Sequence, residues 1–280
     1  QVRPFLYRPL LPFKKFDVTG IREGFGRIGV FQAAVEDGQF SNSHLNPVLF
    51  QRPQDYEVSK LRDNVRGTLK KAFRNSVSVR RMIDEEQFSE RAYPVYLSFY
   101  ERTKYGFDTK RKERTKFATW AHALFQFPEA VILGALVGHE FVSFEITCLV
   151  ENTLIIKTIV TSGRALELGT PDLLLHCYRT VARDQPEVRT IYDGMLSQNR
   201  GLNNYKIMRG ARVTALPAFL RIPASVLWMI RKASGCAHEK LLGLNSQQLG
   251  ARGFERPFTA ERLADGAARL PSVPTPAVEN

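Results

Sequence analysis

The chain has 280 residues, of which 44% are hydrophobic and 24% charged, a composition typical of a globular protein with a sizeable core. Its formal net charge of +12 indicates an anionic partner such as a phosphate-bearing cofactor, nucleic acid or an anionic membrane, against the plainer alternative of a basic solvated surface. Three cysteines without a CxxC spacing and five histidines without an HxxxH pair argue against a disulfide framework or a zinc site, and no apolar run is long enough to span a membrane.

Residues 1–53 contain several prolines, glycines and short apolar runs, which predict an irregular N-terminal segment. The chain begins at Gln1 rather than Met, and we expect this segment to be partial. GFGRIG at 24–29 matches the glycine pattern of dinucleotide-binding loops. Such a loop needs a buried strand before it and a long helix after it. Because TGIRE before it is polar and VFQAAVEDG after it is short, we prefer a glycine-rich turn.

In the next segments the spacing of apolar residues becomes helical. Apolar residues recur at three- and four-residue steps over 58–73 and predict a basic amphipathic helix. SVSVRRM at 76–82 alternates weakly and predicts a strand. A helix over 85–104 follows Asp84, which begins a capping-box pattern. A second helix is expected over 109–126.

Beyond residue 129 the sequence pattern changes from helical spacing to runs typical of strands. Three β-branched runs in close succession predict an antiparallel meander at 130–138, 140–150 and 152–161. GTPDLLLHCYRTVAR at 169–183 then predicts a helix. Thr170 suits the N-cap and Pro171 the first helical position.

The C-terminal part of the chain is predicted to continue with a strand at 188–194, a short helix that ends near Gly210 and a last strand at 211–217. The segment 217–232 is apolar and is predicted to be a helix broken at Pro223.

This pattern divides the chain into three parts. Residues 54–240 are predicted to form one domain with its core at 76–216, after the irregular segment 1–53. Residues 241–280 are rich in Ala, Arg, Glu and Pro and are expected to be a flexible tail.

The order of these elements resembles that of the GNAT-like acyltransferases over residues 76–216. Two stretches, LRDNVRGTLKKAFRNSVSVRRM and IYDGMLSQNRGLNNYKIMRGARV, are similar to the Fem-type and BioF2-like branch of that superfamily. The resemblance implies an α/β (α+β) GNAT-like acyl-CoA N-acyltransferase fold, with a mixed, mostly antiparallel sheet flanked by helices. SGRALELGT stands where ordinary members carry their pyrophosphate-binding loop, and its glycine spacing departs from theirs.

The resemblance further implies a cytoplasmic, metal-independent enzyme. It would move an acyl or aminoacyl group from acyl-CoA, or a similar thioester donor, to an amine acceptor. One alternative is a Fem-type transferase that uses aminoacyl-tRNA and acts on a cell-envelope precursor. Another is a non-catalytic binding module that uses its basic face. Trp228 beside basic ends also predicts peripheral membrane contact through 217–232, against packing on the core.

The same resemblance implies the catalytic roles. Tyr205 would protonate the leaving thiolate, because a tyrosine hydroxyl is a neutral donor at pH 7. Asn199 would hydrogen-bond the pantetheine arm. The plainer alternatives are packing for Tyr205 and helix capping for Asn199. Glu145 and Asp193 are rival candidates for the base that accepts the proton of the amine, and both residue types are more often structural.

The donor phosphates are expected at the helix start formed by Gly169 and Thr170, where backbone N–H groups and the positive end of the helix dipole favour anions. Arg164 adds a positive charge. A plain capped helix is the alternative. The oxyanion of the reaction is expected to meet the N–H groups of a splayed strand.

Overall fold

The computed structural model of the chain describes residues 8–17, 31–103, 112–197 and 199–243. These residues belong to two compact units that alternate along the chain. The first unit contains the described residues up to Val48 and from Val213 on, together with the short link after Gly194. The second contains Leu49–Gly194 and Asn199–Arg212.

The first unit is built on a four-stranded sheet with the order β1-β2-β11-β3. Its strands are β1 (Arg8–Phe16), β2 (Phe31–Val35), β3 (Ser43–Leu45) and β11 (Leu216–Arg221). β1 and β2 are parallel, whereas β11 runs antiparallel to both β2 and β3. The helices α8 (Ala224–Ala233) and α9 (Gly235–Leu242) follow β11.

Two expectations for this unit were wrong. Strands, not irregular chain, occupy much of 1–53, because β2 pairs with β11 from the far end of the sequence, a partner that local pattern does not reveal. For the same reason 217–221 is strand rather than helix, and only the part after Pro223 is helical. The GFGRIG string and nearly all of the tail predicted over 241–280 lie outside the described residues.

The second unit contains a sheet with the strand order β10-β4-β9-β8-β7-β6-β5. These strands are β4 (Pro47–Gln51), β5 (Val77–Arg81), β6 (Ala130–Val137), β7 (Glu140–Val150), β8 (Thr153–Thr161), β9 (Thr190–Met195) and β10 (Arg212–Val213). Neighbours from β5 to β8 are antiparallel, and β9 joins β8 in parallel. The predicted meander and the mixed, mostly antiparallel sheet are confirmed.

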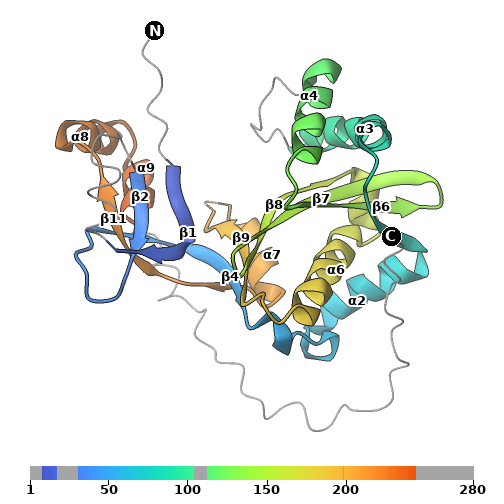
Figure 1. The fold of residues 1–280 in the computed structure, drawn as a ribbon, viewed down its shortest axis with the longest axis horizontal. Coiled ribbons are helices and arrows are strands. Elements are labelled where there is room, and N and C mark those ends of the chain that lie inside the picture. The colour runs from blue at the N-terminus through green and yellow to red at the C-terminus, as the bar shows by residue number, and fades with distance from the viewer. Residues whose placement is uncertain (1–7, 18–30, 104–111, 198, 244–280) are drawn as a thin grey trace. The chain divides into compact units, whose positions relative to one another are not determined.

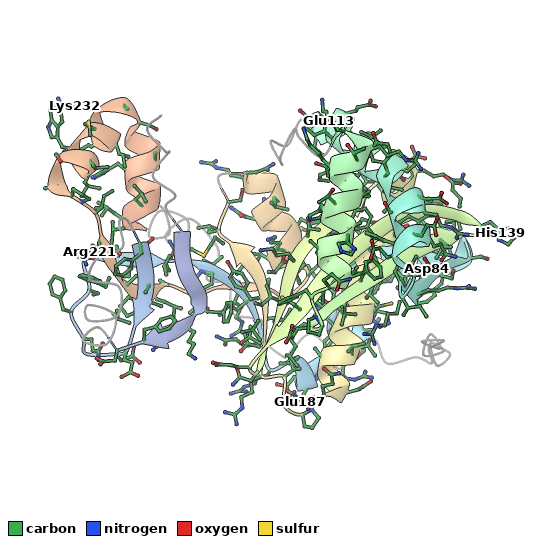
Figure 2. All side chains as sticks on the ribbon, turned by 45° about the horizontal axis from the view of Figure 1, so that its top comes forward. Asp84, Glu113, His139, Glu187, Arg221 and Lys232 are labelled. Carbon is green, nitrogen blue, oxygen red and sulfur yellow. The ribbon has the colours of Figure 1, made fainter. Side chains whose placement is uncertain are left out.

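Helices cover both faces of this sheet, with α3 and α4 on one side and α2 and α6 on the other (Figure 1). Their bounds are α2 (Asp63–Arg74), α3 (Glu85–Thr103), α4 (Arg114–Phe125), α5 (Gly163–Glu167), α6 (Thr170–Asp184) and α7 (Arg200–Met208), with short 3₁₀ turns η1 (Pro53–Asp55) and η2 (Val58–Lys60) before α2. Asp84, which is labelled in Figure 2, caps α3 as predicted, because it accepts the Gln87 N–H at 2.9 Å. The start of the helix expected over 109–126 lies partly outside the described residues.

An aromatic core fills the space between α3, α4 and the sheet. It is centred on Phe88, Phe117 and Phe144, none of which is exposed. A β-bulge in β7 contributes to it, because the register shifts beside Ala135 and leaves Val142 unpaired. The bulge carries Phe141 into this core together with Phe144, two side chains that a regular strand would place on opposite faces.

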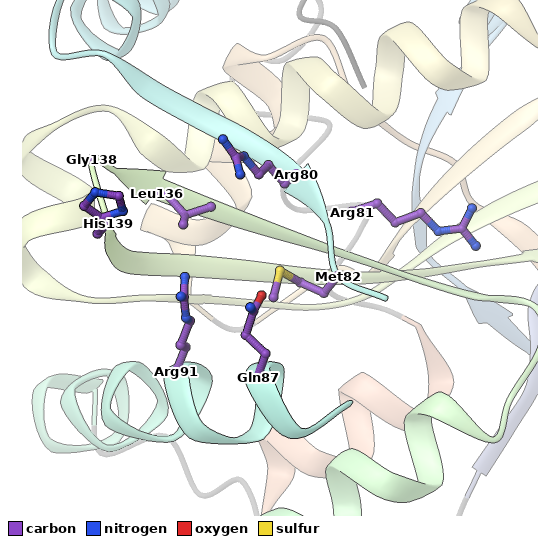
Figure 3. Close-up of a pocket in the computed structure, with 8 residues that line it drawn as sticks. All are labelled: Arg80, Arg81, Met82, Gln87, Arg91, Leu136, Gly138 and His139. Atoms are coloured by element: carbon purple, nitrogen blue, oxygen red, sulfur yellow. The ribbon is translucent and has the colours of Figure 1, made fainter. Parts of the chain in front are cut away.

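Two surface hollows lie along α3. The first has a volume of about 250 Å³ and is lined by Arg80, Arg81, Met82, Gln87, Arg91, Leu136, Gly138 and His139 (Figure 3). The second has a volume of about 380 Å³ and is lined by Arg91, Pro94, Val95, Ser98, Glu140, Phe141 and Ser162. Arg91 is common to both.

Gly169 sets the start of α6. Its φ of +77° is left-handed, and the carbonyl oxygen of Thr68 on α2 lies 2.6 Å from where a Cβ would stand. Gly169 is therefore the N-cap and Thr170 the first helical residue. The helix starts one residue before the predicted position, because a left-handed glycine replaces the expected threonine cap.

Gly169→Ala is predicted to lower the free energy of unfolding by about 2 kcal/mol or more, because a left-handed alanine is strained and its methyl group would clash with α2. Gly163→Ala is the control, since a Cβ there meets nothing within 4 Å, and it should change stability by less than about 1 kcal/mol. Urea unfolding measures both. Equal stability of the two variants would contradict this account of the turn.

Candidate functional site

The parallel strands β8 and β9 pair over a short distance and then part. Their ladder joins three residue pairs and ends at Ile155 and Tyr192. Both strands continue, β8 to Thr161 and β9 to Met195, without a further ladder pair between them in the described residues. A register shift between β7 and β8 leaves Lys157 unpaired just past this point, and such a bulge bends a strand. The ladder between β8 and β9 therefore ends before either strand does.

Glu145 lies on β7, one strand away from the parting. Its side chain is 0% exposed, and neither carboxyl oxygen has a hydrogen-bond partner in the part of the chain that the structure describes. Burial raises the pKa of Glu145 well above its usual value, and the negative charge of Asp193 raises it further. The protonated, uncharged form of the Glu145 carboxyl is therefore favoured. In this form it can donate a hydrogen bond but cannot serve as a base.

Asp193 directly follows Tyr192, the last residue of β9 that pairs with β8. Burial raises its pKa, while the positive charges of Lys206 and Arg179 act in the opposite direction. The Lys206 ammonium lies 3.1 Å from Asp193 Oδ1 and also donates to the Asp193 backbone carbonyl. Asp193 is thus a buried carboxylate with a cationic partner at the end of the paired ladder.

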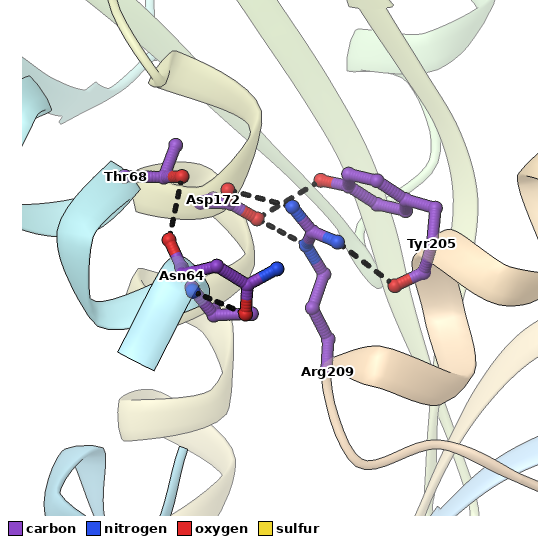
Figure 4. Close-up of polar contacts among 6 residues, drawn as sticks. Asn64, Thr68, Asp172, Tyr205 and Arg209 are labelled. Carbon is purple, nitrogen blue, oxygen red and sulfur yellow. Dashed lines mark hydrogen bonds and ion pairs between the residues drawn. The ribbon is translucent and has the colours of Figure 1, made fainter. Parts of the chain in front are cut away.

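Tyr205 on α7 is linked to the first turn of α6 through Asp172 (Figure 4). Its hydroxyl donates to Asp172 Oδ1 at 3.2 Å. Arg209 donates to both oxygens of Asp172, to Oδ2 at 2.8 Å, and its guanidinium stacks 3.4 Å from the centroid of the Tyr205 ring. Burial, and next the negative charge of Asp172, raise the pKa of Tyr205 above its usual value. The hydroxyl therefore stays protonated at ordinary pH.

A second cation, Arg179 on α6, is buried in this region. Its guanidinium lies 3.6 Å from the ring centroid of Phe50 and 5.1 Å from that of Tyr56. Burial lowers the pKa of Arg179, whereas the charge of Asp193 raises it. Aromatic rings hold this guanidinium, and no carboxylate among the described residues forms an ion pair with it. Its positive charge is therefore not neutralised locally and acts on Asp193.

The residues predicted to bind the donor phosphates divide into two groups. Gly169 and Thr170 are buried beneath α2, and the N–H groups of Asp172 and Leu173 donate to the Gly169 carbonyl. Arg164 on α5 is exposed and pairs with Glu140. Solvent therefore reaches Arg164 rather than the start of α6.

Asn199 is the N-cap of α7. Its side-chain oxygen accepts the Leu202 N–H at 3.2 Å, so the capping role named as the plainer alternative is present. This cap fixes the start of the helix that carries Tyr205 and Lys206. Asn199 therefore affects the site through the position of α7.

Sequence reasoning missed the residues that anchor the predicted ones. In the sequence, Asp172 looks like an ordinary acidic residue in the first turn of a helix. Its partner Arg209 lies 37 residues further along the chain, so no local pattern links the two. Lys206 stands beside Tyr205 in the sequence, but nothing local indicates its pairing with Asp193. Alternation along 188–194 does place Asp193 and Ile191 on one face of a strand, which is a weak signal that Asp193 is buried.

The described residues contain neither a metal-binding cluster nor a membrane-spanning helix. No group of three or more His, Cys, Asp or Glu side chains is arranged to hold a metal ion. Among the helices that the structure describes, none is long and apolar enough to cross a membrane.

Comparison with known proteins gave structural matches alone. No family model and no curated protein matches the chain. L-PGS from Bacillus licheniformis is similar over 80% of this chain and 76% of that one, with a TM-score of 0.53 and 15% identity. FemX is similar over 77% and 72%, with a TM-score of 0.52 and 11% identity. The C-terminal domain of a putative lysylphosphatidylglycerol synthetase from Agrobacterium fabrum is similar over 77% and 74%, with a TM-score of 0.52 and 9% identity. These matches confirm the predicted GNAT-like acyltransferase fold.

Glu145→Gln is predicted to stabilise the protein more at pH 8 than at pH 5. The folded chain keeps a proton that the unfolded chain loses above its usual pKa of 4.5, so wild-type stability falls as pH rises through this range. The amide removes that dependence, which amounts to at most about 1.4 kcal/mol per pH unit. Urea unfolding of both proteins at the two pH values measures the difference.

The exposed Glu90→Gln is the matched control and should show the same difference from wild type at both pH values. A Glu145→Gln variant whose difference from wild type is also independent of pH would mean that Glu145 is ionised in the folded protein.

Proposed function

We propose that the second unit is an N-acyltransferase, which moves an acyl or aminoacyl group from an activated donor to an amine. The observation that carries this proposal is the parting of β8 and β9 beside two buried carboxylates and a tyrosine hydroxyl. A parted pair of strands offers backbone N–H groups that no ladder uses, and an acyl carbonyl needs such donors. The similarity in fold to FemX and L-PGS supports the same class of reaction.

In the proposed reaction the amine attacks the acyl carbonyl carbon, and the carbonyl oxygen becomes an oxyanion. N–H groups of β8 that point toward β9 beyond the end of their ladder stabilise that charge. The C–S or C–O bond to the donor then breaks, and Tyr205 gives its proton to the leaving atom. The amine nitrogen loses a proton to Asp193, directly or through a water. That proton then passes from Asp193 to the Tyr205 oxygen through water, which restores both groups.

Asp193 suits the base role better than Glu145. Lys206 favours its ionised form, whereas Glu145 has no cation within hydrogen-bond reach in the described residues. Glu145 in its protonated form instead donates a hydrogen bond toward Asp193 or the reacting amine once substrate is bound. Asp193 thereby serves as the base and Glu145 as the hydrogen-bond donor. Two carboxyl groups whose environments shift their pKa values differently commonly take such separate roles.

Arg164 is the residue that we assign to the donor phosphates. It is exposed, and its present partner Glu140 leaves it able to exchange one anion for another. Gly169 and Thr170 contribute by fixing the start of α6, and Asn199 by fixing the start of α7 along which the donor arm would lie. The primary donor is acyl-CoA or a similar thioester.

Two alternatives rest on the same fold. A Fem-type transferase would take aminoacyl-tRNA and act on a cell-envelope precursor, and the net charge of +12 suits so large a polyanion. A non-catalytic module would use the basic face without turnover. A cytoplasmic enzyme is proposed in both catalytic versions.

Peripheral contact with a membrane is a further part of the proposal, through α8 of the first unit. No residue of α8 is buried, although residues 226–230 form a continuous apolar run. Trp228 and Met229 are 61% and 53% exposed, and Lys232 stacks over the Trp228 ring at 5.8 Å. Exposed Trp beside Lys and Arg is the pattern of an interfacial helix on anionic lipid.

Tyr205→Phe is predicted to lower turnover about 10²–10⁴-fold, because the ring remains and the acidic proton is lost. The assay follows transfer to a panel of amines from acyl-CoAs, acyl carrier protein and aminoacyl-tRNA. Tyr93→Phe is the matched control, since its hydroxyl bonds the Lys112 carbonyl on the α3–α4 side, and it should keep full turnover.

Wild-type turnover in Tyr205→Phe would exclude the acid role. A loss of turnover with an equal loss of thermal stability would mean that the hydroxyl anchors Asp172 instead. A wild-type protein that binds these donors without transfer to any amine would favour the non-catalytic module.

For the membrane contact, the Trp120→Phe variant leaves Trp228 as the one tryptophan. Its fluorescence is predicted to shift to shorter wavelength on vesicles that contain phosphatidylglycerol, and not on pure phosphatidylcholine. Adding Lys232→Glu should weaken vesicle binding several-fold, because each basic residue near the surface contributes about 1 kcal/mol. A spectrum that anionic vesicles leave unchanged would contradict the contact.

A further inference from the structure

The hollow at the edge of the second unit's sheet is strongly basic. Arg80 comes from the edge strand β5, Arg91 from α3 and His139 from the turn between β6 and β7. Gln87 adds an amide, and no carboxylate belongs to the lining. Figure 3 shows Arg80 and Arg91 on opposite sides of the space, with Gln87 beside Arg91 and His139 at one end.

The arginines of this hollow have no acidic partner. Neither Arg80 nor Arg91 forms an ion pair in the part of the chain that the structure describes, although other exposed arginines do, for example Arg164 with Glu140 and Arg183 with Asp184. Two unneutralised guanidinium groups that face one hollow repel each other, and a bound anion would relieve that repulsion.

The floor of the hollow is closely packed. Met82 lies on it, and Phe141 continues it into the second hollow. Both side chains lie over Gly134 on β6, where a Cβ would stand 2.8 Å from the Met82 sulfur and 2.4 Å from the Phe141 ring. The absence of a side chain at Gly134 therefore leaves room for Met82 and Phe141 beneath the arginines.

We propose that this hollow binds a phosphate ester. A dianionic phosphate or a pyrophosphate matches two guanidinium groups and a neutral amide better than a single carboxylate does. The volume of about 250 Å³ holds a phosphate group rather than a whole cofactor. Arg91 also lines the second hollow, whose wall carries Pro94, Val95 and Phe141, so the organic part of the ligand lies along α3 there.

This site is separate from the one proposed for transfer and does not depend on it. β5 is the edge strand, and β6, β7 and β8 stand between it and β9. None of Tyr205, Asp193 and Arg164 lines either hollow, and only Glu140, the ion-pair partner of Arg164, belongs to the second one. The basic hollow is therefore a second anion site of the chain.

Calorimetric titration of the whole chain with inorganic pyrophosphate in low salt tests the site. Arg80→Gln and Arg91→Gln are each expected to raise Kd at least tenfold. Arg189→Gln is the matched control. It removes the same charge from an exposed arginine that lines neither hollow, and we expect less than a twofold change.

Three results would overturn the proposal. They are the absence of pyrophosphate binding to the wild type at millimolar concentration, an unchanged Kd in Arg80→Gln and Arg91→Gln, and an equal loss of affinity in Arg189→Gln, which would mean that the protein's overall positive charge, not this hollow, attracts the anion. Two further probes then identify the source of the phosphate. ADP that binds more tightly than pyrophosphate indicates a nucleotide, and glycerol 3-phosphate that does so indicates a lipid head group.

Discussion

Helix α7 is held in place by buried charge. Asn203 is the one fully buried residue of α7, and the helix's apolar side chains Tyr205, Ile207 and Met208 are half-buried. Two ionic contacts add to this packing, from Arg209 to Asp172 on α6 and from Lys206 to Asp193 on β9. Breaking either pair would leave a buried charge without its partner, which is costly. Each contact therefore resists displacement of α7. The two contacts determine where Tyr205 lies relative to the parted strands.

The same contacts constrain the chemistry that we propose. The Tyr205 hydroxyl already donates to Asp172, so it must exchange that acceptor for the leaving atom of a donor. Arg209 stays on both oxygens of Asp172 and would hold the carboxylate while the hydroxyl moves. Asp193, with Lys206 beside it, remains available to accept a proton. A structural and a catalytic role for these residues are therefore compatible, and both follow from the burial of charge near the end of β9.

Local sequence pattern predicted the elements that have local causes. The meander over 130–161 follows from β-branched runs, and the start of α3 follows from the Asp84 cap. The strands before residue 53 were missed because β2 pairs with β11 across the length of the chain. In the site, Tyr205 and the two carboxylates were named from pattern and resemblance. Their anchors Asp172, Arg209 and Lys206 were not, because a pair formed by folding leaves no local signal.

The central claim is that an acyl donor enters between β8 and β9. Hydrogen exchange with and without a ketone analogue of acetyl-CoA tests it most directly, with an aminoacyl-adenosine analogue in a parallel sample for the alternative donor. The account predicts that one of the two slows exchange at backbone amides of 156–161 and 193–195, which lie beyond the last ladder pair. Binding of either analogue with unchanged exchange in both segments would contradict it.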